Sequence, residues 1–323
     1  MSAAADTPFS GQRVVLTGAT GFIGAHLAHR LRADGADLSL IVRSAVAAAR
    51  RLPGLDGNAG GPRWIEADLT RRESLRAALR ALRPRFVFHL AADTSGDRSP
   101  EHASTAVAVN FQGTVNLLDA LDTSATEHVV TIGTAEEYGP GAVPFREDQA
   151  PLPLSPYSAS KAAATAWCGM AHRAFGLPVT VLRLFLVYGP GQPPVHLIPQ
   201  AIAAAQRGED FATTRGEQTR DFIYVDDVVG ACCLAATTPA AGGEVINVAS
   251  GEERTVRDVI TRIYREVDGP GRPALGALPY REPEIWRYVG SNQKARDLLG
   301  WVPRIGFDEG LRRTVASYAA GAA

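Results

Sequence analysis

The chain has 323 residues, of which 46% are hydrophobic, and a formal net charge of −1 at pH 7. A charge so close to zero excludes the general attraction to nucleic acid or to anionic membranes that a strongly basic chain would have. The length suits one large α/β domain, or one domain that carries a smaller second one, and no apolar run reaches the roughly 18 residues of a membrane span.

Short apolar runs alternate with helical patterns over the first part of the chain. The sequence predicts strands at Arg13–Thr17, Leu38–Val42, Trp64–Glu66, Phe86–Leu90, Val129–Gly133 and Val179–Leu184. It predicts helices at Ala25–Ala33, Arg72–Leu82, Thr105–Leu121 and Pro156–Phe175, and an exposed loop at Pro53–Pro62. This alternation predicts an α/β fold with a parallel, doubly wound (Rossmann) sheet.

The pattern changes after Tyr188. Glycines and prolines are followed by an expected helix at Ile198–Arg207 and then by a mixture of short strands and helices. We therefore expect a first domain over residues 1–185 and a smaller mixed α/β lobe over residues 186–323. A segment near residues 222–250 is expected to return to the first domain, because Glu244–Val248 is apolar enough for a buried strand.

A glycine-rich segment connects the first expected strand to the first expected helix. Gly18, Gly21 and Gly24 have the spacing GxxGxxG. Glycines in this context let the backbone approach a pyrophosphate at the helix N-terminus. A tight turn and close packing would explain one or two of them, but three favour a dinucleotide site in the first domain. The smaller lobe is then expected to bind the substrate.

The end of the second strand bears on which dinucleotide binds. An acidic residue there would bind the ribose 2′-hydroxyl, whereas this chain has Arg43 and Ser44, which suit a 2′-phosphate. NADP(H) is therefore expected, with NAD(H) as the alternative, because one exposed arginine at a strand end is a weak discriminator.

A tyrosine and a lysine lie four residues apart at the start of the expected helix Pro156–Phe175. Ser155 can cap this helix and Pro156 can take its first position, so Tyr157 and Lys161 share one face. A phenol has a pKa of about 10, and a neighbouring ammonium lowers that pKa toward neutrality. The pair suits a proton transfer beside a hydride transfer. Alone, the spacing would more often mean a packed tyrosine and a solvated lysine.

Further motifs accompany these two sites. They are Thr17–Gly24 (TGATGFIG), Asp68-Leu69, His89–Ala92 (HLAA), Asn110 with Gly113 and Thr114, Tyr157 with Lys161, and Arg220–Asp227 (RDFIYVDD). Together they resemble the extended short-chain dehydrogenase/reductase (NAD-dependent epimerase/dehydratase) family, in its nucleotide-sugar-modifying branch, from about Arg13 to Trp301. The resemblance implies a nucleotide-sugar substrate and a homodimer formed through the helices Thr105–Leu121 and Pro156–Phe175.

The resemblance also implies roles for single residues. The implied catalytic residues are Thr134, Tyr157, Lys161 and Glu136. The implied cofactor-binding residues are Gly18, Thr20, Gly21, Phe22, Ile23, Gly24, Arg43, Ser44, Asp68, Leu69, Leu90, Ala91, Ala92, Asn110, Tyr157 and Lys161. The implied substrate-binding residues are Thr94, Thr134, Arg220 and Arg281, with the two arginines on the diphosphate.

The residues after Thr134 bear on the type of reaction. Dehydratases of this family commonly have Thr-Asp-Glu there. In this chain Ala135 replaces the aspartate and cannot donate a proton, so elimination stays possible through Glu136 but is less favoured. A reductase consumes its cofactor, which agrees with a site suited to NADPH, whereas an epimerase or dehydratase recycles it. Leu186 stands where the family usually has an asparagine, which puts the pose of the substrate in doubt.

We therefore expect an NADP(H)-dependent 4-ketoreductase that acts on a nucleotide-linked 4-keto-6-deoxyhexose. The alternative is a nucleotide-sugar 4,6-dehydratase or 4-epimerase that uses the same threonine, tyrosine and lysine. A remote alternative is a non-catalytic dinucleotide sensor, because a fold by itself does not establish a function.

The remaining polar residues carry weaker signals. Glu136 and Glu137 can be read as solvated loop carboxylates, and Asp226-Asp227 as the cap of a helix. His26 and His29 have no third ligand at a suitable spacing, so no metal site is expected.

The three cysteines, Cys168, Cys232 and Cys233, have no ligand or redox spacing. They are expected to be reduced and mostly buried. With residues 1–10 lacking the pattern of a secretion signal, this predicts a cytoplasmic protein.

Overall fold

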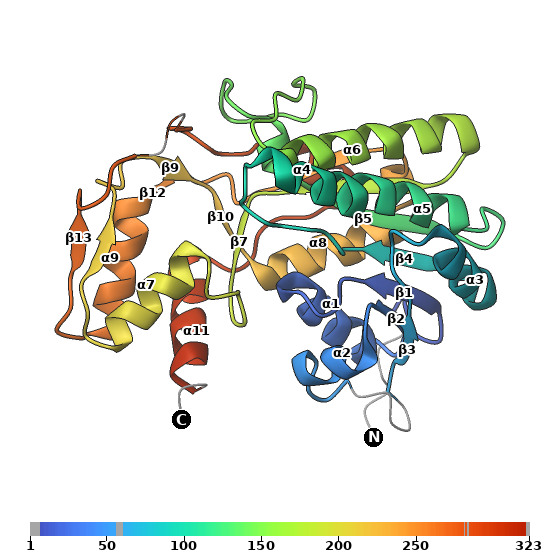
Figure 1. Cartoon of the computed structure of the whole chain (residues 1–323), viewed down its shortest axis with the longest axis horizontal. Coiled ribbons are helices and arrows are strands. Elements are labelled where there is room, and N and C mark those ends of the chain that lie inside the picture. The colour runs from blue at the N-terminus through green and yellow to red at the C-terminus, as the bar shows by residue number, and fades with distance from the viewer. Residues whose placement is uncertain (1–6, 56–60, 281, 283, 321–323) are drawn as a thin grey trace.

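The computed structural model describes residues 7–55, 61–280, 282 and 284–320. Its largest sheet consists of β1 (Arg13–Thr17), β2 (Asp37–Val42), β3 (Arg63–Glu66), β4 (Phe86–His89), β5 (His128–Thr134), β6 (Val179–Leu184) and β11 (Val245–Val248). The strands lie in the order β11-β6-β5-β4-β1-β2-β3, with every pairing parallel (Figure 1). The order reverses between β1 and β4, as in a doubly wound sheet, so the predicted α/β Rossmann fold is confirmed.

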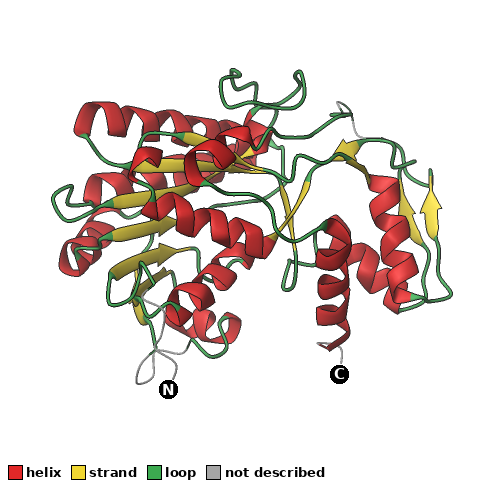
Figure 2. Ribbon diagram, turned by 180° about the vertical axis from the view of Figure 1, so that it is seen from behind, coloured by secondary structure: helices red, strands yellow, loops and turns green. Residues whose placement is uncertain are grey.

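Helices cover both faces of this sheet (Figures 1 and 2). One layer is formed by α1 (Phe22–Ala33), α2 (Ala45–Arg51), α8 (Val225–Thr237) and α10 (Gln293–Leu299). The other layer is formed by α3 (Arg72–Leu82), α4 (Pro100–Ala106), the π-helical η1 (Val107–Gln112), α5 (Gly113–Ala120) and α6 (Pro156–Phe175). Strands enclosed on both faces are expected to be apolar throughout, and β6 is buried at all of its positions.

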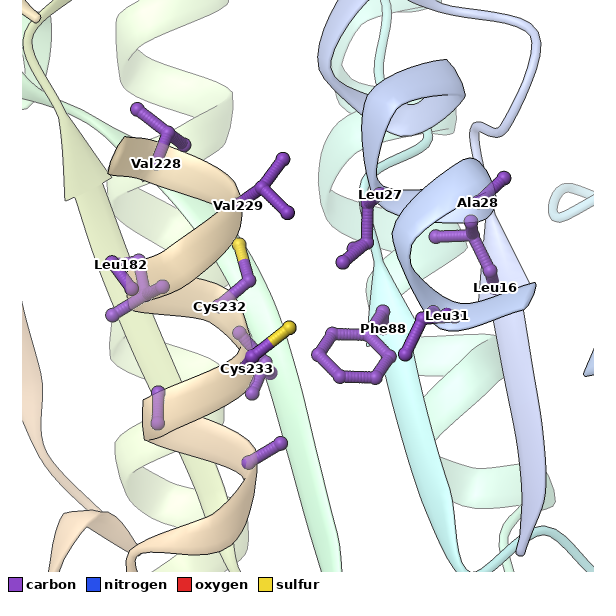
Figure 3. Close-up of a cluster of buried hydrophobic side chains, with 14 of the residues drawn as sticks. Leu16, Leu27, Ala28, Leu31, Phe88, Leu182, Val228, Val229, Cys232 and Cys233 are labelled. Carbon is purple, nitrogen blue, oxygen red and sulfur yellow. The ribbon is translucent and has the colours of Figure 1, made fainter. Parts of the chain in front are cut away.

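The core under α1 and α8 shows how this layer is held on the sheet (Figure 3). Leu16 of β1, Phe88 of β4, Leu27 of α1 and Cys232 of α8 are fully buried in one apolar cluster. Burying a leucine or phenylalanine of this kind stabilises the fold by about 1.5–3 kcal/mol relative to exposure. All three cysteines are free and buried, which confirms their predicted burial.

The smaller lobe lies beside the large sheet and has its own core (Figure 1). It contains the helices α7 (Leu197–Gln206), α9 (Val256–Val267) and α11 (Phe307–Ala320). Its short strands pair as β7 (Leu186–Tyr188) with β10 (Phe222–Tyr224), β8 (Phe211–Thr213) with β13 (Pro273–Leu275), and β9 (Thr219–Arg220) with β12 (Arg254–Thr255). Between these strands the chain passes through α8 and β11, which belong to the larger sheet and its helix layer.

Several element boundaries differ from the sequence predictions. The predicted helix Thr105–Leu121 begins at Pro100, where Ser99 accepts a hydrogen bond from the His102 N–H, and it passes through the π-helical segment. Helix α1 begins at Phe22, directly after Gly21, so Gly24 lies in its first turn. Helix α2 was not predicted, because its alanine-rich sequence has no apolar periodicity. Part of the expected loop Pro53–Pro62 lies outside the described residues.

Two short 3₁₀ segments complete the fold: η2 (Ala135–Glu137), which follows β5, and η3 (Pro239–Ala241), which follows α8. Of the helices in the described ranges, none is both long and apolar enough to cross a bilayer.

Candidate active site

The predicted cofactor residues are distributed along one edge of the large sheet. They follow β1 (Gly18–Gly24), β2 (Arg43 and Ser44), β3 (Asp68 and Leu69) and β4 (Leu90–Ala92), with Asn110 in η1 and Tyr157 and Lys161 in α6. Parallel strands end at the same edge, so the fold brings these residues to the crevice where the strand order reverses.

Two glycines shape the crevice between β1 and β4. Gly18 has a φ of +78°, and a Cβ atom added to it would lie 2.5 Å from the Ala91 nitrogen. A Cβ atom on Gly24 would lie 2.0 Å from the Gly18 oxygen, so α1 can approach β1 closely only with glycine there. Gly21 precedes the first turn of α1, whose N–H groups have no partner within the helix. The crevice therefore fits the pyrophosphate of a dinucleotide.

The end of the crevice that is predicted to bind the adenosine is polar and exposed. Arg43 is exposed, and the Ser44 hydroxyl accepts a hydrogen bond from the Ala47 N–H at 3.3 Å. Hydrogen bonds from Thr70, followed by the charges of Arg43 and Arg71, hold the pKa of Asp68 below its ordinary value.

Glu66 belongs to the same end of the crevice, although no motif in the sequence selects it. Its carboxylate accepts a hydrogen bond from the Ala45 N–H at 2.7 Å, directly after Arg43 and Ser44. A 2′-phosphate at this end would therefore meet a negative charge as well as the positive charge of Arg43.

A buried histidine supports the opposite end of the crevice. The Thr114 hydroxyl donates to the Asn110 carbonyl at 2.7 Å, so it accepts from His89 Nε2 at 3.0 Å. His89 Nδ1 then accepts from the Thr17 hydroxyl at 2.8 Å, and Thr17 in turn accepts from the Ala91 N–H at 3.2 Å. Burial, helped by the charge of Lys161, lowers the pKa of His89 to about 3, so this imidazole is neutral.

The Asn110 side chain is hydrogen-bonded within the protein. Its amide oxygen accepts from the Asp93 N–H at 2.7 Å, and its amide nitrogen donates to the Asp93 carbonyl at 2.9 Å and to the Ser160 hydroxyl at 3.0 Å. This buried side chain therefore joins the segment after β4 to helix α6. Thr94, predicted to bind substrate, is exposed in the same segment.

The Tyr157 and Lys161 pair begins helix α6 as predicted. The Ser155 hydroxyl accepts from the Ser158 N–H at 3.1 Å, and Pro156 occupies the first turn. Lys161 is 5% exposed, whereas Tyr157 is half-buried. The Thr134 side chain at the end of β5 lies close enough to the Tyr157 hydroxyl to lower its pKa, and Lys161 lies one turn further along α6.

Burial dominates the electrostatics of this group. It raises the pKa of Tyr157 above its ordinary value, the charge of Glu136 raises that pKa further, and the contact with Thr134 opposes both. Burial also lowers the pKa of Lys161, and the charge of Glu137 opposes that change. The structure thus reverses the expected direction for Tyr157, and its phenol is protonated at neutral pH.

The two acidic residues after Thr134 differ from each other. Glu136 is exposed, although the protein around its carboxylate still raises its pKa, with Arg98 and Arg220 opposing, so the interpretation as a solvated carboxylate holds for this residue. Glu137 is fully buried and accepts a hydrogen bond from Arg183 Nε at 2.9 Å. The interpretation of both residues as solvated loop carboxylates is therefore wrong for Glu137.

On the substrate side, Arg220 is half-buried and already has partners. Its guanidinium donates to Glu284 at 2.6 Å and to the Ile285 carbonyl at 2.8 Å. Arg281, the second arginine predicted to bind the diphosphate, lies outside the described residues. Leu186 is half-buried in apolar surroundings and adds no polar group.

Tyr288 is a second residue that sequence reasoning missed. It is 4% exposed and packs against Phe145 and Phe185, and its buried hydroxyl has no hydrogen-bond partner in the described chain. Burial raises the pKa of Tyr288, and the charges of Glu136 and Arg220 also act on it. Its hydroxyl therefore has hydrogen-bonding capacity that the described chain does not use. No motif surrounds it in the sequence.

Asp227 does not cap a helix, so that expectation is wrong. Its carboxylate accepts hydrogen bonds from the Arg304 and Ile305 N–H groups at 2.9 and 3.0 Å, and thereby holds the segment before α11.

His26, one of the two histidines considered as metal ligands, is hydrogen-bonded to the Pro190 carbonyl at 2.8 Å. In the described ranges, no group of three or more His, Cys, Asp or Glu side chains is placed to hold a metal ion.

Comparisons with known proteins agree with this geometry. The family model described as "NAD dependent epimerase/dehydratase family" matches residues 14–249. The chain is 34% identical over 311 residues to a UDP-glucose 4-epimerase of Mycolicibacterium smegmatis, covering 94% of this chain and 97% of that protein.

Two solved structures are similar over nearly their whole length. The UDP-glucose 4-epimerase of Thermus thermophilus in complex with NAD has a TM-score of 0.81 and 31% identity, covering 95% of this chain and 99% of the other. RMD from Pseudomonas aeruginosa, complexed with NADPH, has a TM-score of 0.80 and 28% identity, covering 96% of this chain and 99% of the other.

Proposed function

The chain belongs to the NAD dependent epimerase/dehydratase family, and on that premise we propose that it reduces the 4-keto group of a nucleotide-linked 4-keto-6-deoxyhexose with NADP(H). One observation carries the proposal. Tyr157 begins the helix that follows the strand edge carrying the glycine segment, the Thr134 side chain acts on its hydroxyl, and burial raises its pKa so that the phenol keeps its proton. Reduction of a ketone needs such an acid at the oxygen that gains the proton.

The residues of the chain have distinct roles in this reaction. Bound NADPH supplies the hydride that adds to the carbonyl carbon. Thr134 and Tyr157 donate hydrogen bonds to the carbonyl oxygen, and Tyr157 then transfers its proton to that oxygen, which completes the alcohol. Lys161 provides a nearby positive charge, which stabilises the tyrosinate that Tyr157 leaves.

Support for NADP(H) as the preferred cofactor comes from Arg43. This arginine is exposed after β2 and is close enough to Asp68 to affect its pKa. Glu66 weakens the argument, because its carboxylate lies at the same end. We therefore propose a preference for NADP(H) in which NAD(H) still binds.

A nucleotide-sugar substrate is supported by the relatives and by the polar groups around Glu136. Arg220 offers a positive charge to an anionic ligand, the Tyr288 hydroxyl has no partner in the described chain, and Glu136 can accept a hydrogen bond from a sugar hydroxyl. Arg220 would bind a diphosphate by exchanging or sharing its contact with Glu284. Arg281 and Thr94 remain predicted substrate contacts.

A 4-epimerase or 4,6-dehydratase is the second candidate. The similarity to a UDP-glucose 4-epimerase favours the epimerase, and the raised pKa of Glu136 favours a residue that can exchange a proton. Ala135, which is buried, offers no acid for an elimination.

We also propose a homodimer through η1, α5 and α6, where Val107 is 48% exposed. The predicted cytoplasmic location is retained as part of the proposal.

The test is to mix the purified protein and NADPH with a panel of nucleotide 4-keto-6-deoxysugars, and to incubate it separately with the parent nucleotide sugars. Loss of NADPH absorbance in proportion to product is the expected result. Loss of water from a parent sugar without net cofactor consumption would instead indicate a dehydratase. An altered sugar of unchanged mass would indicate an epimerase, and no reaction with any substrate would favour a dinucleotide sensor.

A further inference from the structure

A buried ion pair lies directly behind the proposed catalytic group. Glu137 is fully buried, and Arg183 of β6 is 3% exposed. One oxygen of the Glu137 carboxylate accepts from Arg183 Nε at 2.9 Å, and the other accepts from the Thr134 N–H at 2.9 Å. The carboxylate therefore connects a catalytic residue to a fixed positive charge in the next strand of the sheet.

The surrounding chain is built to accommodate this pair. A Cβ atom on Gly133 would lie 2.7 Å from the Glu137 carboxylate and 2.9 Å from a methyl group of Val181, so only glycine leaves enough room. The Arg183 guanidinium lies over the Tyr138 ring, 4.6 Å from its centroid. Two charges removed from water are stable only when each has its partner.

The pair controls the local geometry of Thr134. Glu137 accepts the Thr134 N–H, while the Thr134 hydroxyl accepts the Glu136 N–H at 3.2 Å, so the two residues close a reciprocal cap on η2. Thr134 is the residue that contacts the Tyr157 hydroxyl. Any displacement of Glu137 would therefore move the hydrogen-bond donor that Thr134 offers to a substrate.

The same carboxylate is the negative charge that acts on Lys161. Burial lowers the pKa of Lys161, and Glu137 is the largest influence that raises it. The other titratable groups that interact electrostatically with Lys161 are the Cys168 thiol of α6 and His89 of β4. His89 is neutral, and burial holds the Cys168 pKa at about 12, so neither carries a charge at neutral pH.

We propose that Glu137, held by Arg183, is a positioning residue for the Thr134, Tyr157 and Lys161 group, because it fixes the Thr134 backbone and supplies the buried countercharge of Lys161. The catalytic part of this inference rests on the proposed function. Its electrostatic part concerns the protein alone, so it can be tested without a substrate.

The composition of the chain makes that test direct. Lys161 and Lys294 are the two lysines of the sequence, so isotope-labelled lysine gives two sets of NMR signals, which Lys294→Arg assigns. In Glu137→Gln the pKa of Lys161 should fall, because the carboxylate that raises it is gone while burial remains. The signal of Lys294, which lies 2.6 Å from Glu244, should stay as in the wild type.

Glu136→Gln is the matched control, because it removes the neighbouring charge, and Glu136 is not among the groups that shift the pKa of Lys161. If Glu137→Gln folds poorly because Arg183 is left unpaired, Glu137→Gln with Arg183→Met removes both charges. The pKa of Lys161 should still fall in that double variant. An unchanged Lys161 titration in both variants would overturn the proposal.

Turnover tests the positioning role. Glu137→Gln should lower kcat by about tenfold to a hundredfold with little change in cofactor affinity, and should shift the pH dependence of kcat. A lower kcat with an unshifted pH profile would mean that Glu137 has a purely structural role. A wild-type protein without turnover, but with the Lys161 shift intact, would contradict the proposed reaction and leave the role of Glu137 as countercharge standing.

Discussion

The two ends of the dinucleotide crevice are built differently. At the catalytic end, His89, Asn110, Lys161 and Glu137 are buried, and the chain itself fixes them through hydrogen bonds or packing. At the adenosine end, Arg43 is exposed and Glu66 bonds a single N–H group. Under the proposed function, the difference means that the chemistry depends on mutually dependent buried contacts, whereas cofactor preference depends on separate surface charges.

Removing the acid at the catalytic end should have the largest effect on activity. Tyr157→Phe should lower turnover by about 10²–10⁴-fold, because the phenyl ring keeps the packing but loses the proton. Cofactor affinity, measured by fluorescence titration with NADPH, should hardly change. Turnover equal to that of the wild type would remove Tyr157 from the mechanism.

Breaking the ion pair at the catalytic end should have the largest effect on stability. Arg183→Met leaves the Glu137 carboxylate buried without its partner, which should cost about 3–5 kcal/mol of unfolding free energy in a denaturant titration. Glu137→Gln combined with Arg183→Met should recover much of that loss. Arg207→Met, at the exposed pair of Arg207 with Glu209, is the control and should change little.

Acid should destabilise the catalytic end through His89. The folded-state pKa of His89 is lowered from 6.5 to about 3, so below pH 6.5 the unfolded chain binds a proton that the folded chain does not. The stability that depends on neutral His89 is complete above that pH and is lost progressively toward pH 3.

This contribution can be isolated by mutation. His89→Gln should flatten the decline of unfolding free energy over this range, even if it is less stable at neutral pH. An equally steep decline in the variant would mean that other groups cause it, among them His128, whose pKa burial lowers to about 4.

Charge changes at the adenosine end should have the smallest effects. Arg43→Asp should weaken NADPH binding by about tenfold more than NADH binding, because only NADPH carries the 2′-phosphate. Glu66→Gln should act in the opposite direction and strengthen NADPH binding severalfold. Equal changes for the two cofactors, measured by calorimetry, would show that neither residue senses the phosphate.

The sequence predicted those elements of the fold whose ends are marked by capping residues, prolines or glycines. Helix α6 has the bounds predicted for it, because Ser155 and Pro156 mark its start and Gly176 its end. The glycine segment and the parallel, doubly wound sheet followed from spacing and alternation, whereas the order of the strands was not predicted. The start of α4 and the π-helical turn at Asn110 were missed, because they depend on packing and on a cap outside the apolar pattern.

The site was predictable where a motif identified it and unpredictable where only tertiary contacts do. Thr134 and Tyr157 were expected to lie together, and the Thr134 side chain does act on the Tyr157 hydroxyl, whereas Lys161 lies one turn further along α6. Glu137 looked like its neighbour Glu136, because nothing local shows that Arg183 lies next to it in the sheet. Tyr288 and Asp227 were misjudged for the same reason, since their partners or neighbours lie far away in the chain.

The most direct test of the central claim uses NADPH deuterated at both C4 positions of the nicotinamide. Incubation with a nucleotide 4-keto-6-deoxysugar, followed by mass spectrometry of the product, should show one deuterium on the sugar carbon for each NADPH consumed, with Tyr157→Phe almost inactive. A product without deuterium, or conversion of a parent nucleotide sugar without consumption of NADPH, would contradict the reductase account.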